Sequence, residues 1–248
     1  MRLLAVALLT VAACASPGET GPEPVPDPAP ESPDTVRATA TTTTIIESPS
    51  TTGPTSSVPV SVVETTTTGP PLGYVFPFGG RDVSYGRGHH DYPAVDVFGC
   101  GATVVAPVRG SVAEIRTVDL WPGSGNNPAY RGGLYVSLIG DDGVRYYFAH
   151  LAGVEVVPGQ VVSEGTPLGV MGETGNAAQS ACHTHFGISW PCEGREWAVR
   201  RGKVWPQDFL DAWRSGNQVS PREAVELVRS TEPDACATAM ADPDAPSA

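Results

Sequence analysis

The chain has 248 residues, of which 40% are apolar, and a net charge of −12. The apolar fraction is sufficient for a folded core, and the length allows one large domain or two small ones. The negative charge argues against a nucleic-acid partner, because nucleic-acid recognition needs a basic surface.

The N-terminus has the pattern of a bacterial export signal. Arg2 precedes an apolar run over residues 3–11, and Ala12-Ala13-Cys14 follows. A transmembrane helix needs about 20 apolar residues, so residues 1–13 are predicted to be a signal peptide. Residues 11–14 resemble a lipobox, whose cysteine becomes the lipid-bearing first residue. We expect Cys14 to anchor the chain to the outer face of the bacterial cell membrane, with plain secretion as the alternative.

A low-complexity segment follows. Residues 15–71 contain 12 Pro, 14 Thr and 7 Ser and no aromatic residue. Such a composition cannot bury enough apolar surface to offset the entropy of ordering, so residues 14–71 are predicted to be a disordered linker. The linker is interpreted as a spacer that lets an anchored domain reach the cell wall. A glycosylated stalk without this role is the alternative.

Residues 72–192 are predicted to form an all-β domain. Short β-branched and aromatic runs alternate with Gly and Pro, and no helical period appears. Gly140-Asp141-Asp142-Gly143 reads as a hairpin turn. The expected architecture is an antiparallel β-sandwich with an active-site groove, and the loop over residues 121–133 is expected to form one wall of it.

The last part of the chain has helical signals. Residues 206–214 and 220–229 are predicted to form two short helices, the second opening on a capping box at Ser220 to Glu223. Residues 193–236 are therefore expected to be a helical extension packed on the β domain. Residues 237–248 are predicted to be a disordered tail.

Four cysteines remain besides Cys14. An even number outside the cytoplasm suggests two disulfides, with three possible pairings. We predict Cys100–Cys182, which would brace the histidine motifs beside it, and Cys192–Cys236. A cysteine metal site is disfavoured because the chain has no CxxC pair.

All five histidines fall in three short segments. His183 and His185 are two residues apart in a predicted strand, so their side chains project from the same face. Asp96 interrupts an apolar strand, where an unpaired carboxylate is unfavourable unless it meets a cation. His150 ends an aromatic strand. Each of these residues alone has an ordinary structural explanation, but their joint occurrence favours a metal or proton-transfer site.

Together the segments resemble the lysostaphin/LytM-type zinc metallopeptidases. The family pattern is an HxxxD motif, a YAHL-like histidine and an HxH motif, and the resemblance runs from about residue 75 to 188. It implies that Asp96, His185 and a histidine of the first motif bind Zn²⁺, and that His150 and His183 are catalytic. In the family, three residues separate the first histidine from the aspartate, which would place that histidine at position 92, where this chain has Tyr92. Five residues separate His90 from Asp96, so two inserted residues are expected to form a bulge. His90 is preferred over His89 as the third ligand.

The resemblance implies a zinc endopeptidase that hydrolyses peptide bonds in peptidoglycan cross-bridges or stem peptides, here as a lipoprotein and expected to be monomeric. The chain has no HExxH glutamate, so the two catalytic histidines would perform the proton transfers. The alternative is a non-catalytic module that binds the wall or activates another wall hydrolase. A structural lipoprotein with incidental histidines is the third possibility.

Overall fold

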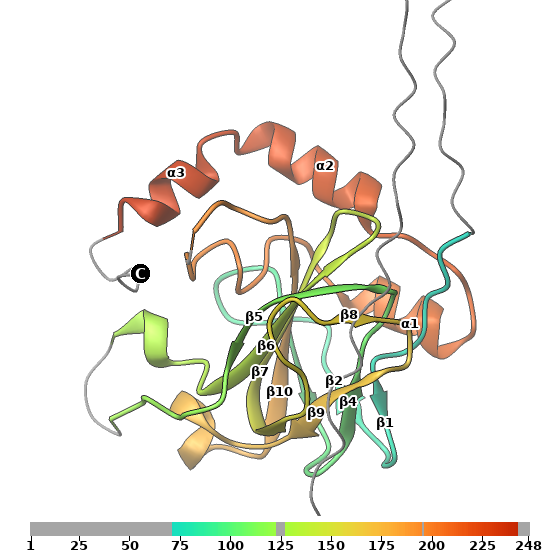
Figure 1. Ribbon diagram of the computed structural model, residues 1–248, viewed down its shortest axis with the longest axis vertical. Coiled ribbons are helices and arrows are strands. Elements are labelled where there is room, and N and C mark those ends of the chain that lie inside the picture. Colours follow the sequence, from blue (N-terminus) through green and yellow to red (C-terminus); the bar gives the residue numbers. More distant parts are fainter. Residues whose placement is uncertain (1–70, 123–126, 195, 243–248) are drawn as a thin grey trace, which may run out of the picture. The chain divides into compact units, whose positions relative to one another are not determined.

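The computed structural model describes residues 71–122, 127–194 and 196–242 (Figure 1). The predicted signal peptide, the lipidation site Cys14 and the linker up to residue 70 lie outside the described residues. Within the described part of the chain, no helix is both long and apolar enough to cross a membrane.

The described region is built mainly of antiparallel strands, as the alternating runs predict. The strands are β1 (Phe78–Gly79), β2 (Ser84–Tyr85), β3 (Val95–Phe98), β4 (Thr103–Val105), β5 (Gly110–Arg116), β6 (Leu134–Gly140), β7 (Arg145–Val154), β8 (Val161–Val162), β9 (Pro167–Met171) and β10 (His183–Ser189). Two 3₁₀ turns, η1 (Pro128–Tyr130) and η2 (Gly175–Gln179), lie in the loops before β6 and β10. The predicted turn at Gly140 joins β6 to β7, and the amide of Gly143 donates to the carbonyl of Gly140 (2.8 Å).

The strands form one curled, ten-stranded sheet, which corrects the predicted two-sheet sandwich. Its main order is β1-β4-β9-β7-β10-β3-β2. A branch leaves this order at β7, where β6 pairs with β7, β5 pairs with β6, and β8 pairs with β5. The ten-residue β7 allows the curling, because β10 pairs with its residues 145–149 and β9 pairs with its residues 151–154. Register shifts in the β5–β6, β6–β7 and β7–β9 pairs bend the sheet further. The result is a half-barrel.

The core fills the inside of this curl. Phe148 on β7 and Phe186 on β10 are fully buried, and their rings stack with centroids 5.0 Å apart. Val95 and Val97 on β3 are also fully buried beside them. This packing fixes the three central strands, and therefore also the side chains on their opposite face.

Three helices follow the sheet, one more than predicted. They are α1 (Gln207–Arg214), α2 (Arg222–Thr231) and α3 (Ala235–Met240), and Figure 1 shows α2 and α3 passing above the strands. Leu210 and Trp213 of α1 join the core. One half of the predicted capping box is present, because Ser220 Oγ accepts from the amide of Arg222 (3.2 Å). Within the described residues, no bond from the Glu223 side chain back to the Ser220 amide completes it.

Disulfides join the pairs that the sequence predicts, Cys100–Cys182 and Cys192–Cys236. The second bond ties the segment after β10 to α3. Helix α3 occupies residues 235–240, where the sequence predicts the start of a disordered tail. The crosslink at Cys236 and the burial of Ala239 explain why a short helix of modest propensity is held there.

Candidate metal centre and catalytic groove

A cleft of about 480 Å³ lies on the face of the sheet opposite the core. All five histidines line it, together with Asp96 from β3 and the η1 end of the loop that was predicted to wall a groove. The lining also includes Tyr92, Tyr147, Arg200 and Arg201.

Strand pairing brings the predicted residues together. In the register of the sheet, His185 on β10 is the partner of Asp96 on β3 and of Ala149 on β7. His183 and His185 face the cleft, while Phe186 and Ile188 lie in the core. The two-residue period of β10 therefore places both imidazoles on one face, as predicted.

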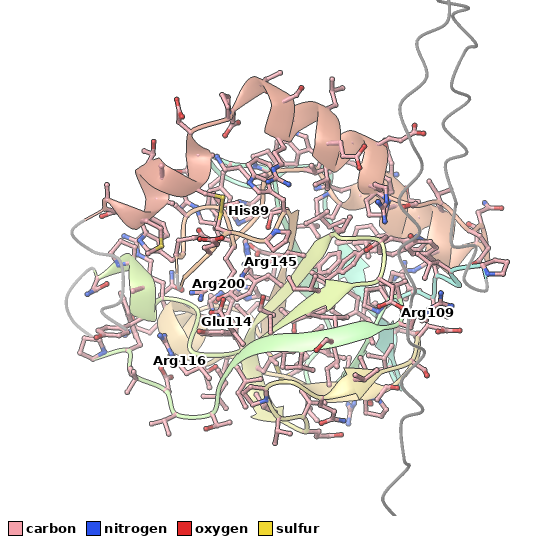
Figure 2. The ribbon with its side chains drawn as sticks, turned by 45° about the horizontal axis from the view of Figure 1, so that its top comes forward. His89, Arg109, Glu114, Arg116, Arg145 and Arg200 are labelled. Atoms are coloured by element: carbon pink, nitrogen blue, oxygen red, sulfur yellow. A yellow bond between two sulfur atoms is a disulfide. The ribbon has the colours of Figure 1, made fainter. Side chains whose placement is uncertain are left out.

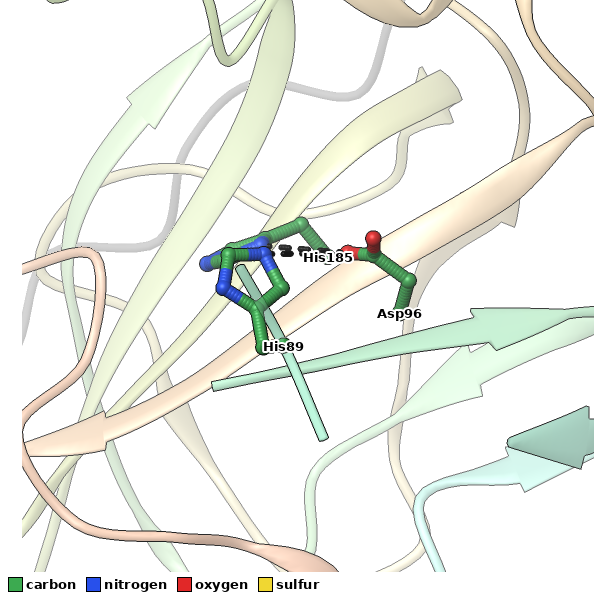
Figure 3. A group of neighbouring side chains, drawn as sticks. All are labelled: His89, Asp96 and His185. Atoms are coloured by element: carbon green, nitrogen blue, oxygen red, sulfur yellow. Dashed lines mark hydrogen bonds and ion pairs between the residues drawn. The ribbon is translucent and has the colours of Figure 1, made fainter. Parts of the chain in front are cut away.

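His89, rather than the preferred His90, completes the cluster. His89 Nε2 lies 3.7 Å from Asp96 Oδ1, and His185 Nδ1 lies 3.3 Å from the same oxygen (Figure 3). The loop before β3 folds back so that His89 Nδ1 donates to the carbonyl of Tyr92 (3.3 Å), whose ring packs on that of His89. His90 lines the cleft but is exposed. Of the two histidines, His89 is therefore the one that could hold a metal ion together with Asp96 and His185.

Backbone carbonyls fix the orientation of four imidazoles. Nδ1 of His89, His150 and His183 faces the carbonyls of Tyr92, Thr174 and Ala181, at 3.3, 2.9 and 2.7 Å. His185 is the exception, because its Nε2 faces the carbonyl of Arg201 at 2.7 Å. A carbonyl only accepts hydrogen bonds, so each of these nitrogens carries the proton. The opposite nitrogen of each ring is left with a lone pair.

These lone pairs converge on Asp96. Its Oδ1 lies 3.3 Å from Nδ1 of His185, 3.7 Å from Nε2 of His89 and 3.8 Å from Nε2 of His183. Acceptors that face one another at these distances require a shared cation, which is either a proton or a metal ion.

The chemistry of the donor set fits zinc. Three possible ligand atoms lie within 4.8 Å of one another, one each from His89, Asp96 and His185. Ligands at 2.0–2.2 Å from a tetrahedral zinc are about 3.4 Å apart, close to the distances of 3.3 and 3.7 Å that separate Asp96 Oδ1 from the nitrogens of His185 and His89. Two histidines and one carboxylate are a typical catalytic zinc set, with a fourth position left for water or substrate.

His150 has an unusual backbone. Among the described residues it is the one non-glycine residue with positive φ, at 63°. Its amide donates to the carbonyl of Gly132 (2.8 Å) and its ring to that of Thr174, which hold the conformation. The positive φ breaks the alternation of β7, and the His150 ring lies 4.9 Å from that of His183. Such strain is typical of functional positions.

Burial adjusts the titration of the cluster. Desolvation, followed by the charges of His185 and His183, lowers the pKa of His150 to about 3. The pKa of His89 is lowered by burial and then by His185. Burial alone would raise the pKa of Asp96, but in the metal-free protein a proton shared with Nδ1 of His185, together with the nearby imidazoles, holds it at about 2. At neutral pH the site therefore presents an ionised carboxylate and a neutral His150.

Sequence reasoning missed several cleft residues. Arg201 stacks on Tyr92, with its guanidinium carbon 3.7 Å from the ring centroid, and supplies the carbonyl for His185. Arg200, which stands in the basic run Arg200-Arg201-Gly202-Lys203, is buried. Tyr147 on β7 reaches the cleft floor. The alternation of side chains along β7 would have predicted Tyr147 on the cleft face. The positions of the two arginines could not be predicted in this way, because they depend on contacts with residues far away in the sequence.

Comparisons with known proteins agree with the geometry. Residues 91–200 match peptidase family M23. No match is found among curated proteins.

Among solved structures, the chain is similar to the catalytic domain of lysostaphin from Staphylococcus simulans, with 27% identity over 53% of this chain and 92% of that chain and a TM-score of 0.40. The longer lysostaphin structure gives 28% identity over 55% of this chain and a TM-score of 0.42, and the match spans 51% of that protein. A zinc-containing peptidase from Vibrio cholerae gives 19% identity over 53% and 38% of the two chains and a TM-score of 0.38. Residues 91–200 are therefore similar to peptidase family M23, the family whose model they match.

Proposed function

We propose that this protein is a zinc-dependent endopeptidase that hydrolyses peptide bonds in peptidoglycan cross-bridges or stem peptides. The observation that carries the proposal is the convergence of unprotonated nitrogens of His89 and His185 with the carboxylate of Asp96, beside two further oriented histidines. His89, Asp96 and His185 would hold the metal. Zinc bound there would polarise a peptide carbonyl and lower the pKa of a water molecule.

His150 and His183 are assigned the proton transfers. Each ring donates Nδ1–H to a backbone carbonyl, which fixes the ring and stabilises it when it becomes positively charged. Each Nε2 is free to accept a proton from water or to return one to the leaving amine. The short separation of the two rings, 4.9 Å between centroids, lets both act on one bound peptide.

The cell wall is the proposed location of the substrate. The family match, the predicted export signal and the two disulfides support an extracytoplasmic site of action. A lipid on Cys14 and the Pro/Thr/Ser-rich linker would hold the catalytic region at the membrane surface and let it reach peptidoglycan. The non-catalytic alternative is disfavoured, because every ligand and catalytic position is filled.

Metal content measured beside peptidoglycan hydrolysis tests the assignment. Asp96→Ala and His185→Ala remove a ligand, so bound zinc and activity should fall together. His183→Ala and His150→Ala leave three ligands, so zinc should stay near one per chain while activity drops by about 10²–10⁴. Zinc lost in His183→Ala but kept in His185→Ala would invert the assignment. Zinc bound by a wild-type protein that cuts nothing would favour the non-catalytic module.

A further inference from the structure

The segment after β10 returns to lie against the metal centre. The amides of Lys203 and Val204 donate to the carbonyl of Ile188 at 2.8 and 3.0 Å. A Cβ atom added to Gly187 would lie 2.3 Å from the carbonyl oxygen of Arg201, and one added to Gly202 would lie 2.2 Å from that of Pro93. The segment is thus pressed between β10 and the loop that precedes β3.

This contact determines which nitrogen of His185 faces the ligands. The carbonyl of Arg201 accepts from Nε2 of His185 at 2.7 Å, so the lone pair is on Nδ1, toward Asp96. If the carbonyl moved away, the proton could occupy Nδ1, and the ring would no longer present a lone pair to a metal. Hydrogen bonds from a metal-binding histidine to a second group commonly set its tautomer and its basicity.

Arg200 is the side chain that ties this segment to the sheet. Its side chain is 2% exposed, and Nη1 donates to Glu114 Oε2 on β5 (2.7 Å) and to the hydroxyl of Tyr135 on β6 (3.2 Å). The guanidinium also covers the rings of Tyr135 and Tyr147, 4.5 and 5.2 Å from their centroids. Figure 2 shows Arg200 beside Glu114, inside the fold.

A second buried contact orders the backbone of the same segment. The carboxylate of Glu196, which is fully buried, accepts from the amides of Val199 (2.6 Å) and Arg200 (3.2 Å). The segment is therefore fixed on both sides of Arg200, and Arg201 follows directly. Arg200 consequently controls where the Arg201 carbonyl lies.

We infer that Arg200 is a positioning residue for the metal centre: by holding its segment to Glu114, it keeps the Arg201 carbonyl on Nε2 of His185 and leaves Nδ1 for the metal. This inference rests on the proposed zinc site. It predicts that a residue which touches no metal ligand through its side chain nevertheless sets metal affinity.

Arg145 supplies a matched control. It is also 2% exposed and donates to the other oxygen of Glu114 (Oε1, 3.1 Å), but it belongs to β7 rather than to the segment after β10. Arg200→Met and Arg145→Met each remove one buried arginine and leave Glu114 paired with the other, so neither variant leaves the carboxylate without a cation. Arg200→Lys keeps the charge and tests for rescue.

The experiment measures the zinc dissociation constant by competition with a chromogenic chelator, together with the urea midpoint and the imidazole N–H signals of the zinc-loaded full-length proteins. Arg200→Met should weaken zinc binding by about 10–100-fold and lose the slowly exchanging Nε2–H signal of His185. Arg145→Met should lower the midpoint but keep the wild-type dissociation constant and signal, and Arg200→Lys should recover part of the affinity.

Each contrary result has a separate meaning. Wild-type zinc affinity in a folded Arg200→Met variant would overturn the positioning role while leaving the proposed function intact. Equal loss of zinc in Arg200→Met and Arg145→Met would also overturn it, because the effect would then follow general destabilisation. A wild-type protein that binds no zinc would refute both this inference and the proposed function.

Discussion

Replacing His150 by glycine and by alanine should give a stability order opposite to the usual one. Both changes remove the ring and its bond to Thr174, so they differ only at the backbone. A non-glycine residue in the left-handed region costs about 1–3 kcal/mol, and His150 has φ of 63°. In an ordinary strand, glycine is about 0.5–1 kcal/mol less stable than alanine. We therefore expect His150→Gly to be more stable than His150→Ala by about 1 kcal/mol.

Urea unfolding of the two metal-free variants measures this difference. Ala149→Gly is the control one residue earlier in β7, where φ is not positive, and it should destabilise the protein in the usual direction. Both His150 variants should also lose about 10²–10⁴ of the hydrolytic rate while retaining zinc. An alanine variant more stable than the glycine variant would show that the backbone at position 150 is not held in the left-handed region, and the strain argument would fail.

Three further outcomes are expected. Elemental analysis should find zinc near one per chain in His90→Ala and strongly reduced zinc in His89→Ala, whereas the reverse would restore His90 as the ligand. In the folded, metal-free protein the pKa of Asp96 is about 2, against an ordinary 3.8. Ionised Asp96 therefore contributes about 2 kcal/mol to the free energy of unfolding above pH 4, and this contribution is lost as the pH falls through about 2. Acid unfolding of Asp96→Asn should lack this loss, and identical curves for both proteins would contradict it. Cys14→Ala should leave the membrane fraction of expressing cells, and unchanged fractionation would exclude the predicted lipid anchor.

Local sequence patterns predict much of this site because it is built on strands. Alternation in β10 was enough to place His183 and His185 on one face, and Val95 and Val97 marked Asp96 as a carboxylate within an apolar strand. The choice of His89 was not predictable in this way, because a loop has no regular alternation of side chains. The direction of the His89 ring depends on its hydrogen bond to the backbone carbonyl of Tyr92.

Long-range pairing explains the other differences. Whether short antiparallel strands form two sheets or one depends on β7, whose two halves have different partners. The burial of Arg200 depends on Glu114, which lies far away in the sequence. Helix α3 depends on the bond between Cys192 and Cys236. The first two contacts leave no signal in neighbouring residues, and the third was predicted as a disulfide but not as the anchor of a helix.

The most direct test of the account is digestion of purified peptidoglycan by the zinc-loaded protein, with the released fragments identified by mass spectrometry. The account predicts fragments that end at newly cut peptide bonds, their loss after treatment with a chelator, their return when zinc is restored, and their absence with His183→Ala that still carries zinc. Intact peptide bonds in every digest, from a wild-type protein shown to contain zinc, would contradict the proposed endopeptidase activity.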